Sequence, residues 1–319
     1  PLLTPHLSPL TPHPSPLTLI QVRERDWANV VTCHEGCTSA YTWSTASRAL
    51  ASNVLNLKSG AIVTAVTVST CGNFGLLAGE DGAVEKHNLQ SGQRRACAVS
   101  PLHTGPVRGV ATEALGLYAF SGGADGTVRT WHLSDLKHVA TLDASSPVAA
   151  LRPQRGSDLL AASCDDTAVR IFDTSVGRLV RVLRGHKNTI TDFDWSADGR
   201  WLLTASLDST LRIVDVPSGV TIGWYRLDDP PISIAVSPQG EYIATTHAST
   251  NAICVWANRS FFSSALISPV GESPTPLEMP TACGTGEEEE EEEEEGNESL
   301  DGDAADDDGV DDDDDDDDD

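Results

Sequence analysis

The sequence predicts an all-β fold, and three observations lead to this class. Between residues 26 and 262, short apolar runs rich in Val, Ile, Leu and Thr alternate with Gly, Asp, Asn and Ser, a pattern typical of many short strands. No stretch keeps the spacing of an amphipathic helix for long. Strand endings of one kind recur at intervals of 44, 44, 41, 42 and 42 residues. A period near 40–45 residues predicts a WD-repeat β-propeller, with one four-stranded blade in each period.

The repeated element is a strand that ends on an aromatic or apolar position. The six endings are Trp43, His87, Trp131, Phe172, Val214 and Trp256. We expect five complete blades and a sixth that lacks its first strand. An incomplete sixth blade would leave open strand edges that expose unpaired backbone. We therefore expect either a fragment or a ring that closes on sequence outside this chain.

Aspartate marks the turn that precedes most of these endings. It stands six residues upstream in four cases, which are Asp81, Asp125, Asp166 and Asp208. Each begins a tight turn between paired strands, and in Asp81-Gly82 and Asp125-Gly126 the glycine permits a positive φ. We interpret these residues as structural blade-turn aspartates.

Histidine adds a second periodic feature. In WD blades a His, a Ser or Thr, the turn Asp and the terminal Trp form one hydrogen-bonded chain. The complete set here is His103, Ser121, Asp125 and Trp131, and a second set, His186, Thr204 and Asp208, has Val214 in place of its Trp. Each bond of such a network contributes roughly 1 kcal/mol, and the network fixes the register of the blade.

The two ends differ in composition from the body. Residues 1–20 contain a proline-rich near-repeat, for which we expect a disordered leader, with a proline-rich ligand for an adaptor domain as the less favoured alternative. Residues 21–266 form the expected propeller. Residues 267–319 form the expected disordered tail, with runs of nine Glu and nine Asp. The tail either attracts basic proteins such as ribosomal proteins or histones, or only aids solubility.

The charge of the body indicates no nucleic-acid surface of its own. The 319-residue chain has a net charge of −27, yet 26 of its 48 acidic residues lie after residue 270, where there is no Lys or Arg. The rest carries 22 acidic against 21 basic residues, so any RNA contact would be local or indirect. No apolar run approaches the roughly 18 residues of a membrane span, and seven cysteines in mostly apolar stretches favour reduced intracellular thiols.

Catalytic and metal chemistry are not predicted. His, Ser and Asp could form a nucleophilic triad, but here they recur with the blade period and there is no GxSxG motif. Cys33, His34 and Cys37 lack the partner pair that zinc would need. We therefore assign no catalytic, cofactor-binding or metal residue and no cofactor. The aromatic residues that could anchor a partner are more simply strand packing; they are Trp195, Trp201, Trp224 and Tyr225.

Two stretches resemble one specific family. RERDWANVVTCHEG followed by AYTW, and RWLLTASLDSTLRIVDVPSG followed by EYIATTH and ICVWANRS, are similar to the U3 small nucleolar RNA-associated protein twenty-one family, also called WD-repeat protein thirty-six. The resemblance covers about residues 21–262. It implies the second of two tandem seven-bladed propellers, and the family's first propeller and helical C-terminal domain have no counterpart here.

The resemblance also implies a function. Family members belong to the nucleolar small-subunit processome, with the U3 ribonucleoprotein, and support pre-rRNA processing. We therefore expect a non-catalytic scaffold in the nucleus and nucleolus that contacts other processome proteins and the U3 ribonucleoprotein, with pre-rRNA contacted indirectly and no membrane partner. The alternative is a general WD-repeat adaptor, either a ubiquitin-ligase substrate receptor or a reader of basic histone or ribosomal protein tails. The residues that bind partners stay unassigned.

Overall fold

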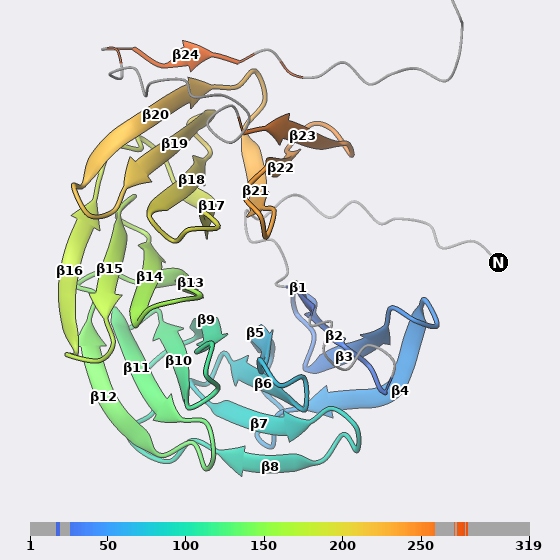
Figure 1. The fold of residues 1–319 in the computed structure, drawn as a ribbon. Coiled ribbons are helices and arrows are strands. Elements are labelled where there is room, and N and C mark those ends of the chain that lie inside the picture. The colour runs from blue at the N-terminus through green and yellow to red at the C-terminus, as the bar shows by residue number, and fades with distance from the viewer. Residues whose placement is uncertain (1–16, 20–25, 259–270, 272, 278, 280–319) are drawn as a thin grey trace, which may run out of the picture. The chain divides into compact units, whose positions relative to one another are not determined.

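A computed structural model describes residues 17–19, 26–258, 271, 273–277 and 279. The chain divides into two units, residues 1–280 and 281–319, and all described residues belong to the first. Every regular element in these described ranges is a β-strand, and the strands form small sheets that follow one another in sequence order (Figure 1). The all-β propeller class predicted from the repeat is confirmed.

Four sheets have four antiparallel strands each, and a fifth has four antiparallel strands and one further short strand. The first holds β1 (Leu17–Leu19), β2 (Val30–Cys33), β3 (Ser39–Ser44) and β4 (Ala49–Asn56), and the second β5 (Val63–Val68), β6 (Phe74–Gly79), β7 (Val84–Asn88) and β8 (Arg94–Cys97). The third holds β9 (Val107–Thr112), β10 (Tyr118–Gly123), β11 (Thr127–His132) and β12 (His138–Asp143), and the fourth β13 (Val148–Pro153), β14 (Leu159–Cys164), β15 (Val169–Asp173) and β16 (Arg178–Leu183). The fifth holds β17 (Ile190–Trp195), β18 (Trp201–Ser206), β19 (Thr210–Asp215) and β20 (Val220–Arg226). We call these sheets blades one to five.

Blade six has three strands, β21 (Pro231–Val236), β22 (Tyr242–His247) and β23 (Ile253–Ala257). We expected one of the six blades to lack its first strand, and this expectation was wrong about which strand is absent from the described residues. The first strand of blade one is present as β1, and the described part of blade six ends before an outer strand. Three residues beside a proline-rich run are too few to show an alternating pattern, so β1 gave no signal in the sequence.

A short strand, β24 (Thr275–Pro276), adds to the outer edge of blade five in parallel with β20. β1 and β24 lie within the segments 1–20 and 267–319, for which we expected disorder. Most of both segments falls outside the described residues, so the domain limits 21–266 stay a prediction.

The core lies between neighbouring blades. The penultimate residue of the third strand faces the preceding blade, as Trp131 does against Ala65 and Ala78 of blade two. The residue three positions earlier faces the following blade, as Val128 does against Val148 and Leu160 of blade four. Each large side chain buried in this way stabilises the fold by roughly 1.5–3 kcal/mol.

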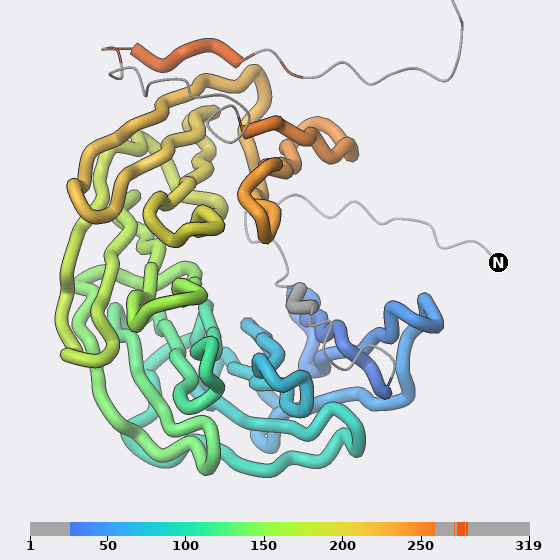
Figure 2. Tube along the Cα trace, in the orientation of Figure 1, coloured from blue at the N-terminus to red at the C-terminus, as the bar shows by residue number. Residues whose placement is uncertain are grey.

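This facing rule leaves apolar residues exposed on the first and last blades. Ile253 corresponds to the buried Val128 but is 69% exposed, and Trp43 corresponds to the buried Trp131 but is 37% exposed. Figure 2 shows the chain passing from one blade to the next between these two ends. Among the described residues, the outward faces of blades one and six therefore lack the cover that a neighbouring blade gives the others.

Candidate functional site

The four predicted turn aspartates occupy the same place in blades two to five. In each blade the next residue has a positive φ, which is 82° at Gly82, 76° at Gly126, 62° at Thr167 and 59° at Ser209. The carboxylate accepts the N–H two residues on, at 3.1 Å in Asp81, 3.1 Å in Asp125 and 3.0 Å in Asp208. In blade four Asp166 accepts the N–H of Ala168 and also forms a two-bond ion pair with Arg170 at 2.9 and 2.6 Å.

The structure brings the complete predicted set of blade three together. Trp131 Nε1 donates to Ser121 Oγ at 2.8 Å, and Ser121 Oγ lies 2.8 Å from His103 Nε2. His103 Nδ1 lies 3.0 Å from Asp125 Oδ1, to which Thr127 Oγ1 also donates at 2.8 Å. The His103 side chain has no exposure to solvent. The chain of bonds runs from the loop before β9 to the third strand, so it ties the entrance of the blade to its centre.

The electrostatics of this network favour a charged aspartate and a neutral histidine. Burial opposes ionisation of Asp125, but the hydrogen bonds from His103 and Thr127 outweigh it and lower its pKa to about 2. Burial lowers the pKa of His103 below its usual value in spite of the Asp125 carboxylate. Ser121 is fully buried between Trp131 and His103, so its hydroxyl is not exposed to solvent.

Blade five contains the second predicted set. His186 Nε2 lies 2.8 Å from Thr204 Oγ1, and His186 Nδ1 lies 3.2 Å from Asp208 Oδ2. Hydrogen bonds from His186 and Thr210 hold the pKa of Asp208 well below its usual range, although burial acts the other way. Val214 stands where blade three has its Trp, and it packs in the core between blades four and five.

Sequence reasoning missed a related network in the first and last blades. Trp43 Nε1 donates to Thr32 Oγ1 at 2.9 Å, and Thr32 Oγ1 lies 3.3 Å from His34 Nε2. Blade six repeats this arrangement with Trp256, Thr245 and His247, at 2.8 and 2.9 Å. The signal that could have found both is Thr-x-His followed by Trp nine residues after the His.

Blade two replaces the network with buried charge. Glu85, Lys86 and His87 are all buried on β7. His87 Nε2 lies 3.2 Å from Glu85 Oε2, and Lys86 Nζ donates to the carbonyl of Leu133 at 2.7 Å. These contacts give partners to Lys86 Nζ, His87 Nε2 and the Glu85 carboxylate, whereas the buried His87 Nδ1 has no hydrogen-bond partner among the described residues.

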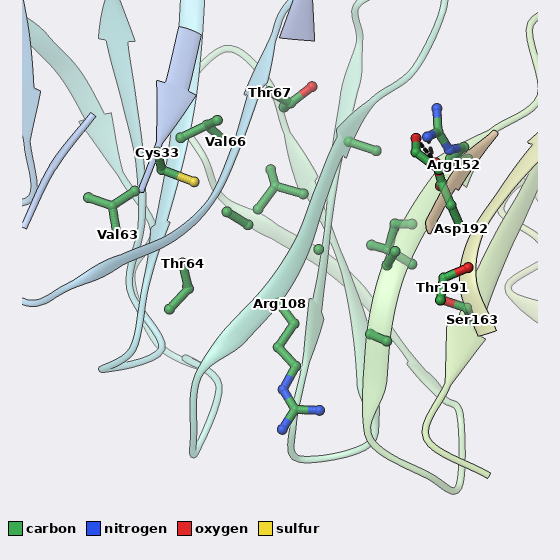
Figure 3. A pocket seen from close by; sticks show the side chains of 18 of the residues that line it. Cys33, Val63, Thr64, Val66, Thr67, Arg108, Arg152, Ser163, Thr191 and Asp192 are labelled. Atoms are coloured by element: carbon green, nitrogen blue, oxygen red, sulfur yellow. Dashed lines mark hydrogen bonds and ion pairs between the residues drawn. The ribbon is translucent and has the colours of Figure 1, made fainter. Parts of the chain in front are cut away.

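A second polar constellation lies on the inner strands, beside a cavity of about 820 Å³. Arg152 of β13 pairs with Asp192 of β17 at 2.9 Å, as Figure 3 shows. The other oxygen of Asp192 accepts bonds from Ser233 Oγ at 2.7 Å and Ile234 N at 3.1 Å in β21. Asp194 accepts the N–H of Val236 at 2.9 Å, and burial raises its pKa. These carboxylates connect three successive blades.

The remaining sequence candidates are placed as follows. Trp195 is buried, and Trp201, Trp224 and Tyr225 are half-buried, so each packs at least partly within its sheet. Within the described ranges, no three His, Cys, Asp or Glu side chains lie close enough to hold a metal ion. The described residues also contain no helix of the length and hydropathy that crossing a membrane requires. The acidic runs lie outside the described residues.

The chain matches known proteins over most of its length. The family model described as the WDR36/Utp21 second beta-propeller domain matches residues 12–280. The U3 small nucleolar RNA-associated protein 21 homolog of Schizosaccharomyces pombe is 39% identical over 75% of this chain, and the WD repeat-containing protein 36 of Homo sapiens is 32% identical over 83%. U3 small nucleolar RNA-associated protein 21 of Saccharomyces cerevisiae is 34% identical over 78%.

The alignments cover only part of each relative. The chain spans 27%, 30% and 26% of the lengths of the fission yeast, human and budding yeast proteins, respectively. The family model matches far more than half of this chain, and it describes the same all-β blades that the structure contains. The chain therefore belongs to the WDR36/Utp21 family and corresponds to its second β-propeller domain.

Proposed function

We propose that this protein is a non-catalytic scaffold subunit of the small-subunit processome, which supports pre-rRNA processing and 18S rRNA maturation. The observation that carries the proposal is the family match over residues 12–280, together with relatives whose names state an association with U3 small nucleolar RNA. Its partners are then other processome proteins and the U3 ribonucleoprotein, its contact with pre-rRNA is indirect, and its place is the nucleolus.

The geometry supports a scaffold for a physical reason. The polar residues with the most hydrogen bonds hold the blades together: Asp125 bonds to His103 within blade three, and Asp192 of blade five bonds to Ile234 of blade six. A propeller held in this way is rigid, and the loops at its rims can contact several partners at once.

The first experiment is recovery of U3 small nucleolar RNA with the tagged full-length gene product from cell extract. We expect strong enrichment over other small nuclear RNAs. If an intact, soluble protein gives no enrichment, the processome proposal is wrong, and the general WD-repeat adaptor replaces it. The acidic tail would then be tested for binding to basic histone or ribosomal protein tails.

The proposal that the chain has no catalytic role has its own test. A labelled serine or cysteine hydrolase probe should leave the protein unmodified. Modification at one residue that disappears when the histidine beside it is replaced would overturn this part of the proposal.

A further inference from the structure

The outer strand of blade four, β16 (Arg178–Leu183), carries more exposed apolar side chains than the outer strands of the other described blades. Leu179, Val180 and Val182 are 43%, 41% and 38% exposed. The corresponding strand of blade one has two large exposed hydrophobic residues, and those of blades three and five have one each. Single exposed apolar residues are ordinary on a protein surface, but a group along one strand marks an interaction surface.

The same strand is basic. Residues 174–191 contain Arg178, Arg181, Arg184 and Lys187 and no acidic residue. The nearest carboxylates already have partners. Asp166 forms its two short bonds with Arg170 and lies 3.9 Å from Arg184, while Asp173 accepts bonds from Ser175 and Val176. Positive charge on β16 is therefore only partly neutralised by the protein's own acids.

The backbone of β16 is also free to pair. It is the last strand of its sheet, and no described strand lies on its outer edge. The neighbouring blade shows what this kind of edge accepts. There β24 runs parallel to β20, and Leu277 N donates to the carbonyl of Arg226 at 2.8 Å. Leu277 and Met279 then pack against the core cluster that contains Leu211 and Leu227.

We propose that β16 binds, by strand addition, an extended segment of a partner protein in which acidic and apolar residues alternate. Main-chain bonds to an open edge supply affinity, and the alternating side chains supply specificity. The bulge at Val180 leaves Arg178 and Arg181 on one face of β16 and Leu179 and Val182 on the other. Acidic residues of the partner would lie beside the two arginines, and its apolar residues would cover Leu179 and Val182. An RNA strand is the poorer fit, because exposed valines offer nothing to phosphates. This inference rests on the proposed scaffold function and names the chemistry of one partner.

The test uses the full-length protein and a fluorescent peptide of alternating glutamate and valine, with a lysine and valine peptide as the control. We expect the acidic peptide to bind at least about tenfold more tightly, with an affinity that falls as salt is added. Val180→Asp should weaken its binding about tenfold or more.

Val139→Asp in β12 is the matched control. Val139 and Val180 are the extra residues at equivalent bulges of neighbouring blades, and Val139 is 44% exposed. This variant should bind like the unaltered protein. Equal binding of the two peptides, equal effects of the two substitutions, or displacement of the acidic peptide by an oligouridine would overturn the proposal.

Recovery of U3 small nucleolar RNA is measured with the same preparations. If the RNA is recovered but Val180→Asp leaves peptide binding unchanged, only the strand-addition proposal fails. If the RNA is not recovered but the peptide binds at β16, the surface remains and the scaffold function fails.

Discussion

Replacing Asp125 with alanine isolates the contribution of the blade-three network. The carboxylate accepts bonds from His103 Nδ1 at 3.0 Å, Thr127 Oγ1 at 2.8 Å and the backbone N–H groups of Thr127 and Thr104 at 3.1 and 3.2 Å. Water can reach the backbone donor of the exposed Thr104, but the His103 side chain is fully enclosed. Without the carboxylate, the enclosed His103 Nδ1 keeps only the Thr127 hydroxyl, 3.3 Å away, and we therefore expect the free energy of unfolding to fall by about 1–3 kcal/mol.

Asp81→Ala is the matched control for this variant. Asp81 begins the corresponding turn in blade two, and the adjacent Gly82 has a positive φ of 82°, close to the 76° of Gly126. The side chain of Asp81 accepts a bond from the exposed N–H of Ala83 at 3.1 Å, which water can replace. We expect this substitution to cost no more than about 0.5 kcal/mol.

Chemical unfolding followed by tryptophan fluorescence measures both variants, because Trp131 belongs to the network. Asp125→Ala should lower the denaturant midpoint clearly more than Asp81→Ala does. Equal shifts in the two variants, or no shift in Asp125→Ala, would show that the network does not stabilise the blade.

Three further outcomes follow from the same contacts. Because burial lowers the pKa of His103 below 6.5, the unfolded state takes up a proton at a higher pH than the folded state does. The free energy of unfolding should therefore fall as the pH drops below about 6.5, and it should fall less in His103→Gln. Asp192→Ala should speed hydrogen exchange in residues 231–236 but not in 107–112, and equal change in both would contradict the inter-blade link. Trp256→Phe should cost about 1 kcal/mol in unfolding experiments by removing the donor to Thr245, and an unchanged midpoint would contradict that bond.

The repeat made the centre of the fold predictable. A blade places its third strand, its turn and its entrance loop at fixed distances along the chain, so His103 and Asp125 could be paired from spacing alone. Their hydrogen bond at 3.0 Å joins residues 22 apart, and the same separation joins His186 to Asp208.

Contacts between blades gave no such signal. Asp192 and Asp194 read as ordinary residues of a strand, and nothing in their own blade indicates their partners. Those partners are Arg152 in the preceding blade and Ser233 to Val236 in the following one, about one repeat away in each direction. Inner strands of separate sheets make no backbone ladder with one another, and these carboxylates accept N–H groups across the gap between blades. Which N–H groups they reach depends on how the blades pack.

The first and last blades differ from the central ones for a related reason. In blade three the network needs His103 from the loop that enters the blade, so a blade built this way depends on that loop for its register. In blade one Thr32, His34 and Trp43 lie on or beside two neighbouring strands, and blade six uses Thr245, His247 and Trp256 in the same way. The entrance loop of blade six adds only the carbonyl of Asp229, 3.1 Å from His247 Nδ1. Because their bonds close within one blade, these two sheets can hold their register while their outward faces lack a neighbour.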